Sequence, residues 1–233
     1  MGEQKMGRVI TPEIMAYLEL ESIILEFPDG DHPADITIIN PTSLWLLLPQ
    51  TYFSPDKQLN ARFRFAGRYY TTPLRFLKSI KQCDYELAEF DFRLEAFPVQ
   101  IIDKLQEIFI LTEAVQRRQN ERLELDDTVC NQFNIVQEAT FHYGNMKQNC
   151  ILKDISFSGC RFICFGKNYE IVPGISVAVR IRFTNPHESF PIFGKLLRKT
   201  IVKAQDTYLS DCAVQFRTPV NMFFEKRLFI CFN

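Results

Sequence analysis

The chain has 233 residues, of which 46% are hydrophobic and 24% charged, with 27 basic against 28 acidic side chains. Disordered chains are poor in bulky apolar residues and carry a large net charge, so this composition excludes disorder as the main state. A net charge of −1 also argues against a bulk binder of DNA, because such domains have a strong basic excess. The charge is uneven, however: residues 1–112 have a net charge of −5, and residues 113–233 have one of +4.

The first half of the chain has the pattern of an antiparallel β domain. Thr11-Pro12 predicts the start of a short helix, with Thr as the N-cap and Pro at the first helical position. Short runs rich in Phe, Ile, Val and Tyr follow, separated by Asn, Asp, Gly and Pro, as is typical of strands and turns. The predicted strands lie near 22–28, 34–40, 44–48, 59–65, 73–80 and 84–95.

A helical connector is predicted between the two halves. After Pro98, apolar side chains recur at helical spacing over residues 98–112, at Val99, Ile102, Leu105 and Phe109. This helix runs directly into the basic cluster Gln116-Arg117-Arg118. We therefore predict an N-terminal domain over 1–112, including the connector, and a C-terminal domain over 113–233.

The second half has the same β pattern. From Ile175 to Phe183, apolar residues alternate with Ser, Ala and Arg, which predicts a strand with one face in a core and the other in water. Thr218-Pro219 predicts the N-cap of a terminal helix over 219–231. The fold class is therefore mainly β, with two small antiparallel β-barrel domains in tandem, joined by a helical connector, and a C-terminal helix. The other predicted strands of this half lie at about 134–142, 149–153, 159–165, 192–203 and 211–216.

The chain lacks the sequence signatures of an enzyme. It has no glycine-rich dinucleotide loop, Walker loop, His-Glu-x-x-His or Gly-x-Ser-x-Gly. The adjacent carboxylates of Asp126-Asp127 are predicted to be solvated surface groups. A Cys150/His142 nucleophile pair lacks a third group to orient it. We predict no catalytic residues.

The cysteines and histidines indicate neither disulfides nor a metal site. The seven Cys have no regular spacing and include no Cys-x-x-Cys, and the three His lie far apart. We expect Cys160 and Cys164 to be buried apolar residues. No apolar run has the length of a membrane span, and the N-terminus lacks a signal peptide, so a cytoplasmic protein without membrane insertion is expected.

Two short motifs suggest a ligand site. Arg118-Gln-Asn-Glu-Arg122 is an R-x-x-x-R, preceded by Arg117, and Asp154-Ile-Ser156-Phe-Ser-Gly159 is a D-x-S-x-x-G that begins 32 residues after Arg122. Both motifs in this order and setting should occur by chance in roughly 1% of chains. The arginines also fit a solvated helix end, and the second motif fits a tight turn in which Gly159 adopts an unusual dihedral.

These motifs resemble the hallmark of the PilZ family of cyclic di-GMP receptors. The resemblance covers about residues 113–233, and the continuation Gly159-Cys-Arg161-Phe162 is also typical. The whole layout resembles the flagellar-brake type, in which an N-terminal β domain precedes the PilZ barrel. In the first half, Asn40-Pro-Thr-Ser-Leu-Trp45 stands where a second D-x-S-x-x-G would be expected if the halves were duplicates. It has no glycine and no partnering arginine pair, so we predict a degenerate PilZ-like barrel without a nucleotide site.

The resemblance implies cyclic di-GMP as the ligand and no other cofactor. This ligand has two phosphodiester charges and two guanines, and an Arg fork can meet the O6/N7 edge of guanine bidentately. Asp154 suits the guanine N–H donors, Ser156 adds a hydroxyl, and Gly159 would allow close backbone approach. An Arg at position 117 favours a stacked pair of ligands. The implied ligand-binding residues are Arg117, Arg118, Arg122, Asp154, Ser156, Gly159 and Arg161.

The predicted function is that of a sensor. A ligand that touches both the linker arginines and the barrel would change the interdomain orientation and so signal to a protein partner. The resemblance implies control of motility, with a flagellar-motor component as one candidate partner and virulence among the possible outputs. The alternative is a PilZ-like adaptor that binds no nucleotide and acts through protein–protein interaction. A third hypothesis, an enzyme using the cleft between the domains, has no residue constellation behind it.

Overall fold

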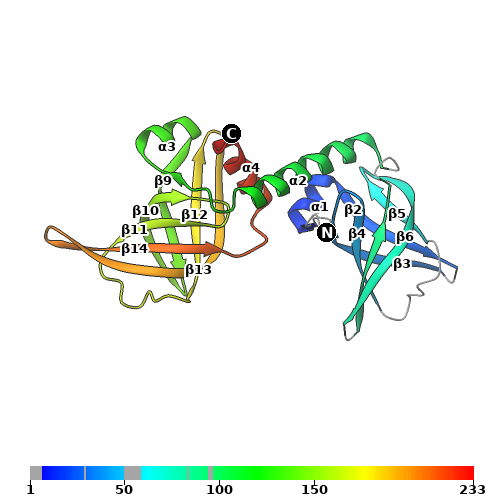
Figure 1. The fold of residues 1–233 in the computed structure, drawn as a ribbon, viewed down its shortest axis with the longest axis horizontal. Coiled ribbons are helices and arrows are strands. Elements are labelled where there is room, and N and C mark those ends of the chain that lie inside the picture. Colours follow the sequence, from blue (N-terminus) through cyan, green and yellow to red (C-terminus); the bar gives the residue numbers. More distant parts are fainter. Residues whose placement is uncertain (1–6, 29, 50–58, 83, 94–96) are drawn as a thin grey trace. The chain divides into compact units, whose positions relative to one another are not determined.

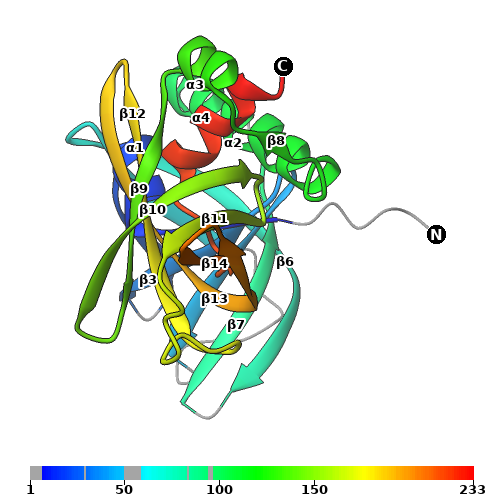
Figure 2. The same ribbon diagram turned by 90° about the vertical axis from the view of Figure 1, so that its left-hand side faces the viewer.

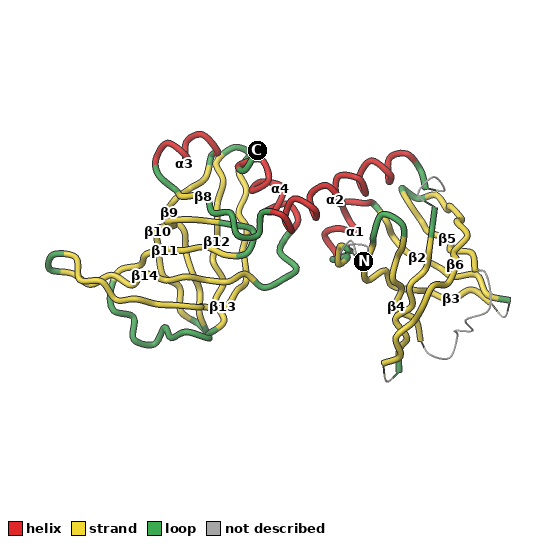
Figure 3. Tube along the Cα trace, in the orientation of Figure 1, coloured by secondary structure: helices red, strands yellow, loops and turns green. Residues whose placement is uncertain are grey.

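The chain divides into two compact units, Met1–Glu113 and Ala114–Asn233. The structure is a computed structural model that describes residues 7–28, 30–49, 59–82, 84–93 and 97–233 (Figure 1). Figure 3 shows that most of each unit is strand. Each unit has one helix near the start of its part of the chain and one at the end. The predicted fold class, mainly β with two barrels, a connector helix and a C-terminal helix, is confirmed.

The N-terminal unit is a closed antiparallel barrel. Its pairing order is β3-β2-β5-β6-β7-β4, and β4 pairs back with β3, while the short β1 adds to β3. Phe63 and Phe90 are fully buried in it, and Phe63 stacks on Phe97 with ring centroids 4.5 Å apart. Its elements are β1 (Arg8–Val9), α1 (Pro12–Leu18), β2 (Leu20–Phe27), β3 (Gly30–Ile39), β4 (Ser43–Pro49), β5 (Leu59–Phe65), β6 (Arg68–Gln82), β7 (Tyr85–Asp91) and α2 (Val99–Arg117).

The C-terminal unit is a second closed barrel. The order is β10-β9-β12-β13-β14-β11, and β11 pairs back with β10, while β8 adds to β10. Helix α4 lies against this barrel (Figures 1 and 2). Its Phe224 and Leu228 belong to the core of the barrel. The elements are β8 (Leu123–Glu124), α3 (Asp127–Phe133), β9 (Ile135–Tyr143), β10 (Met146–Ile155), β11 (Gly159–Phe165), β12 (Ser176–Thr184), β13 (His187–Ala204), β14 (Thr207–Phe216) and α4 (Met222–Cys231).

Most local predictions match the structure. Along β12, Val177, Val179, Ile181 and Phe183 are buried, whereas Arg180 and Arg182 on the opposite face are exposed. Thr11 caps α1 by accepting a hydrogen bond from the backbone N–H of Ile14 at 3.4 Å. The predicted burial of Cys160 and Cys164 is confirmed. The predicted strand over 84–95 ends at Asp91, and residues 94–96 lie outside the described part of the chain.

Two helix starts differ from the prediction. Helix α4 begins at Met222, not at Pro219, because Asn221 is its N-cap: Asn221 Oδ1 accepts from the N–H groups of Phe223 and Phe224 at 3.0 and 3.2 Å. Helix α3 was not predicted. Asp126, although exposed as expected, caps it by accepting from Val129 N at 2.8 Å. In both cases a short polar side chain satisfies N–H groups that a helix start leaves without a partner.

The two units have the same topology. Each strand of the first unit corresponds to the strand seven places later, α1 corresponds to α3, and α2 corresponds to α4. The pairings match one by one, including the short strand that adds to the barrel (β1 or β8). The chain is therefore two copies of one architectural unit, although the two halves differ at the positions of the predicted site, as described below.

Candidate functional site

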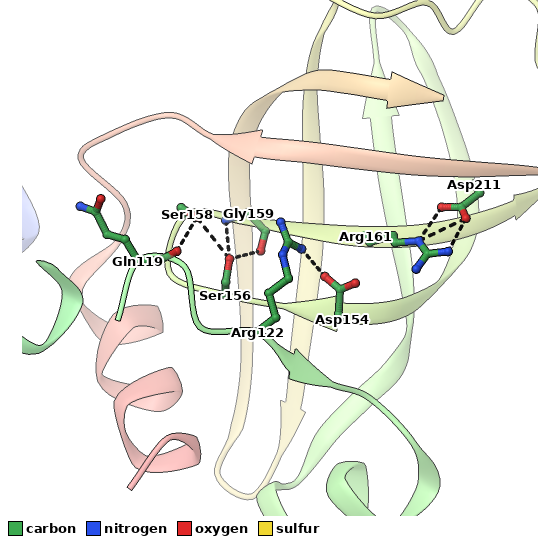
Figure 4. A network of polar contacts seen from close by, with 8 residues as sticks. All are labelled: Gln119, Arg122, Asp154, Ser156, Ser158, Gly159, Arg161 and Asp211. Atoms are coloured by element: carbon green, nitrogen blue, oxygen red, sulfur yellow. Dashed lines mark hydrogen bonds and ion pairs between the residues drawn. The ribbon is translucent and has the colours of Figure 1, made fainter. Parts of the chain in front are cut away.

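The turn between β10 and β11 contains the D-x-S-x-x-G motif. Ser156 is fully buried, and its backbone N–H donates to the Gly159 carbonyl at 2.8 Å. The Ser156 hydroxyl donates to that same carbonyl at 3.0 Å and accepts from Gly159 N at 3.1 Å (Figure 4). These bonds satisfy the polar groups of a buried turn. Ser156 therefore shapes the turn from inside the protein and does not present its hydroxyl at the surface.

Gly159 is required by close packing of two strands. Its φ lies outside the left-handed region, so it does not supply the unusual dihedral that the turn hypothesis predicted. A Cβ on Gly159 would instead overlap the backbone carbonyl oxygen of Val214 on β14. The bare backbone lets β11 and β14 approach at the point where the turn enters the sheet. Close packing of β11 and β14 therefore explains why position 159 is a glycine, whether or not a ligand binds.

Arg122 and Asp154 form an ion pair at the outer edge of this turn. Arg122 directly precedes β8, whose Leu123 and Glu124 pair with Ile155 and Asp154 of β10. This register sets the Arg122 guanidinium beside Asp154, and Nη1 donates to Oδ1 (Figure 4). The Asp154 side chain is 12% exposed and that of Arg122 47%. A guanidinium has five N–H donors. The bond to Asp154 therefore anchors Arg122 and leaves its other donors available on the exposed part of the side chain.

The loop that contains the arginines is attached to the barrel. The Ser158 hydroxyl, at the tip of the β10–β11 turn, donates to the Gln119 carbonyl at 2.8 Å. Strand β8 holds the other end of the loop on β10. Contacts within the C-terminal unit therefore bring the R-x-x-x-R segment and the D-x-S-x-x-G turn together.

Arg118 is bound by the end of helix α4. Its Nη1 donates to the carbonyl of Phe232 at 2.5 Å and its Nη2 to Asn233 Oδ1 at 3.0 Å. The Phe232 carbonyl belongs to the last turn of the helix, where such groups lack intrahelical partners and attract cations. Arg117 is the last residue of α2 and is exposed.

Arg161 lies next to Asp154 on the same outer face, because the two are paired across β10 and β11. It forms a bidentate ion pair with Asp211: Nε donates to Oδ1 at 2.8 Å and Nη2 to Oδ2 at 2.5 Å. The Asp211 carboxylate raises the pKa of Arg161, and the Arg161 guanidinium lowers the pKa of Asp211. With 41% of its side chain exposed, Arg161 retains donors for a second acceptor.

The first unit has no counterpart of these groups. The matching register places Ile38, Asn40 and Ser43 where the second unit has Asp154, Ser156 and Gly159. The equivalent segment is therefore 38–43, two residues earlier than the predicted 40–45. Gly7, which precedes β1, occupies the position of Arg122.

The structure also describes the groups that other kinds of site would use. Burial raises the pKa of Cys150 to about 12, which opposes its use as a nucleophile. The described residues contain no group of three or more His, Cys, Asp or Glu placed to hold a metal ion. Among the helices that the structure describes, none combines the length and apolar character needed to cross a membrane.

Residues 116–228, which lie within the C-terminal unit, match the PilZ domain family, as the motifs of this segment predicted. A cyclic di-GMP binding protein of Treponema denticola is 27% identical over 169 residues. The match covers 68% of this chain and 53% of that relative, so the chain spans about half the relative's length.

Solved structures give more distant matches. The Borreliella burgdorferi PlzA protein in complex with c-di-GMP is 17% identical, with a TM-score of 0.48 over 99% of this chain and 95% of PlzA. The PilZ domain of Escherichia coli YcgR with c-di-GMP is also 17% identical, with a TM-score of 0.38 over 48% of this chain and 88% of that domain.

Several residues at the site were not predicted. Ser158 connects the turn to the arginine loop, Asp211 holds Arg161, and the carbonyl of Phe232 holds Arg118. Ser158 occupies a variable position of the D-x-S-x-x-G motif, where its hydroxyl is the signal that sequence offers. Asp211 and Phe232 have no local sequence signal, because each meets its partner only through the closure of the barrel and the docking of α4.

Proposed function

We propose that the chain is a cyclic di-GMP receptor whose site is the outer edge of the β10–β11 turn. The observation that carries this proposal is the convergence of Arg122, Asp154 and Arg161 on one outer face beside the loop that holds Arg118. The name of the Treponema relative supports it, since that protein binds the same ligand. No bond is made or broken in this function.

The chemistry of the site suits a guanine dinucleotide. Arg122 is anchored by Asp154 and can turn its free donors to a guanine edge or to a phosphodiester oxygen. Asp154 accepts only, which suits the N–H donors of guanine. Arg117 is exposed at the end of α2, directly before the arginine loop, and its guanidinium can stack on a base face. Ser156 and Gly159 contribute through the shape of the turn.

Arg118 connects ligand binding to a change in the protein. We propose that Arg118 exchanges the Phe232 carbonyl and Asn233 for phosphate or guanine acceptors when the ligand binds. A hydrogen bond to a charged group contributes roughly 1.5–3 kcal/mol, so two or three such contacts could supply the ~5.5 kcal/mol that moves an equilibrium from 1:99 to 99:1. We infer that the released α4 terminus and the α2–Arg118 junction transmit binding as a change of interdomain orientation.

The N-terminal unit is proposed to have no nucleotide site of its own. Ile38 supplies no acceptor where Asp154 stands in the second unit, and Gly7 supplies no cation in place of Arg122. We propose that this unit presents the signal to a protein partner in the cytoplasm. Control of motility is the output that the resemblance to the flagellar-brake type implies, with a flagellar-motor component as the candidate partner.

One observation favours the adaptor alternative. Arg118, Arg122 and Arg161 each already have an acceptor within the protein. In an adaptor these contacts would be permanent and the site would take no nucleotide.

A calorimetric titration of the full chain with cyclic di-GMP separates the two functions. The receptor should bind with a dissociation constant on the order of micromolar, which corresponds to about 8 kcal/mol. Absence of binding at ~100 µM ligand, where such a site would be nearly saturated, would reject the receptor function in favour of the adaptor.

A further inference from the structure

A second polar pocket lies on the outer face of the C-terminal barrel. It has a volume of about 400 Å³ and is open to solvent. Two of its residues are cations and none is a carboxylate. The lining residues are Gly174, Ser176, Gly194, Lys195, Gln215, Phe216 and Arg217.

The strand register places this pocket on the same face as the proposed ligand site. Gly159 of β11 is directly opposite Gln215 of β14, and Gln215 is directly opposite Lys195 of β13. Residues directly opposite one another point to the same face of a sheet. Neighbouring strands lie about 4.8 Å apart, so Lys195 is roughly 10 Å across the sheet from Gly159.

The two cations of this pocket have no acidic partner. Within the described part of the chain, neither Lys195 nor Arg217 makes an ion pair or a side-chain hydrogen bond. Elsewhere in the same unit, side-chain acceptors or carbonyls engage many of the arginines. These are Arg118, Arg122, Arg161, Arg180, Arg182 and Arg227.

The two glycines of the pocket have different roles. Gly194 is buried and lets β13 and β14 pack closely, because a Cβ there would overlap the backbone carbonyl oxygen of Gln215 and crowd the core side chain of Val214. Gly174 has a φ of +95°, and a Cβ there would lie 3.9 Å from Cε of Lys195. The Lys195 side chain therefore passes close to Gly174, and Lys195 and Arg217 are both exposed.

We propose that Lys195 and Arg217 form a phosphate subsite, separate from the Arg122–Asp154 site and on the same barrel face. Two unpaired cations in a pocket whose lining contains no carboxylate create a positive potential that attracts an anion. Arg offers a planar fork for phosphate oxygens and Lys a point charge, and the Gln215 amide can add a neutral donor. The pocket volume falls within the range of small-molecule sites. The phosphate belongs either to the cyclic dinucleotide of the proposed function or to a free phosphate anion.

The subsite itself is tested with inorganic phosphate. Amide NMR spectra of the full chain should show saturable shifts at Gly174, Gly194 and Gln215. In the Lys195→Gln/Arg217→Gln double variant, the affinity for phosphate should fall by at least tenfold. Lys203→Gln is the matched control, because it removes one exposed charge from the same strand outside the pocket, and it should leave the affinity unchanged. No saturable shift, or equal shifts in the double variant, would overturn the proposal.

Cyclic di-GMP titrations identify the source of the phosphate. If it belongs to the dinucleotide, the double variant should also bind cyclic di-GMP about tenfold or more weakly, whereas a free phosphate site leaves that affinity unchanged. Both results support the subsite and assign its ligand. Arg118→Ala should weaken dinucleotide binding at least tenfold yet keep the phosphate shifts. A failure of the receptor function therefore remains distinguishable from a failure of the subsite.

Discussion

Replacing Gly159 with Ala tests how the turn is held against the barrel. The added Cβ would overlap the Val214 carbonyl oxygen, and it would stand 3.3 Å from the Val214 carbonyl carbon and 3.5 Å from Gln215 Cα. All three atoms are backbone atoms of β14, so relief requires the two strands to separate. Overpacking of this kind costs about 1–3 kcal/mol. With a urea m-value of about 1–3 kcal/mol/M, the unfolding midpoint of the C-terminal unit should fall by about 1 M.

The chain offers separate probes for its two units. Trp45, the single tryptophan, is on β4 of the N-terminal unit, whereas Cys160, Cys164 and Cys212 are buried in the C-terminal core. Thiol labelling of these cysteines at increasing urea, located by mass spectrometry, reports the second barrel, and Trp45 fluorescence reports the first. Gly159→Ala should lower the midpoint of labelling and leave that of fluorescence unchanged.

The comparison variant is Gly144→Ala in the β9–β10 turn. Nothing lies within 4 Å of a Cβ at Gly144, whose φ is +50°, so this change costs only the backbone strain of a left-handed residue, about 1 kcal/mol. If Gly159→Ala were no more destabilising than Gly144→Ala, the packing reason given for Gly159 would be refuted.

Two further predictions concern polar contacts of the same unit. Because Arg161 lowers the pKa of Asp211, the ion pair adds stability above the usual Asp pKa of about 3.9 and loses it as the pH falls through the lowered value. The difference in urea midpoint between wild type and Asp211→Asn should therefore be constant from pH 7 to about pH 5 and narrow by pH 3; an equal difference at pH 3 and pH 7 would contradict this. Asn233→Ala removes one of the two acceptors that hold Arg118, so cyclic di-GMP should bind about twofold more tightly by calorimetry, since an exposed hydrogen bond contributes about 0.5 kcal/mol; weaker binding would refute the proposed exchange.

The strands and the motif positions were predictable because their signals are local. Val177, Val179 and Ile181 alternate with less apolar residues, and this pattern indicates a half-buried strand whichever strands it pairs with. The N-cap of α1 likewise needs only Thr11 and the residues that follow it. Helix α3 was missed because seven residues give too short an apolar pattern to recognise, although Asp126 is a typical N-cap.

The geometry of the site was less predictable, because it depends on contacts between distant strands. The glycine of D-x-S-x-x-G was expected to serve an unusual dihedral or a ligand, yet its neighbour is Val214, 55 residues further along the chain. Ser156 was expected to offer its hydroxyl to a ligand, and it lies buried instead. In the first unit, the matching segment was placed two residues too late, because only the register of β3 with β4 defines the correspondence.

Calorimetric titrations with cyclic di-GMP that compare Arg118→Ala with Arg180→Ala test directly whether the arginine loop binds the ligand. Both variants lose one guanidinium from the C-terminal unit, but Arg180 lies on β12, where its Nη1 donates to the Ser189 hydroxyl at 3.3 Å. Loss of a charge-assisted contact of roughly 1.5–3 kcal/mol predicts at least tenfold weaker binding for Arg118→Ala. Arg180→Ala should bind as wild type does. Equal affinity in the two variants would contradict the assignment of the arginine loop to the ligand site.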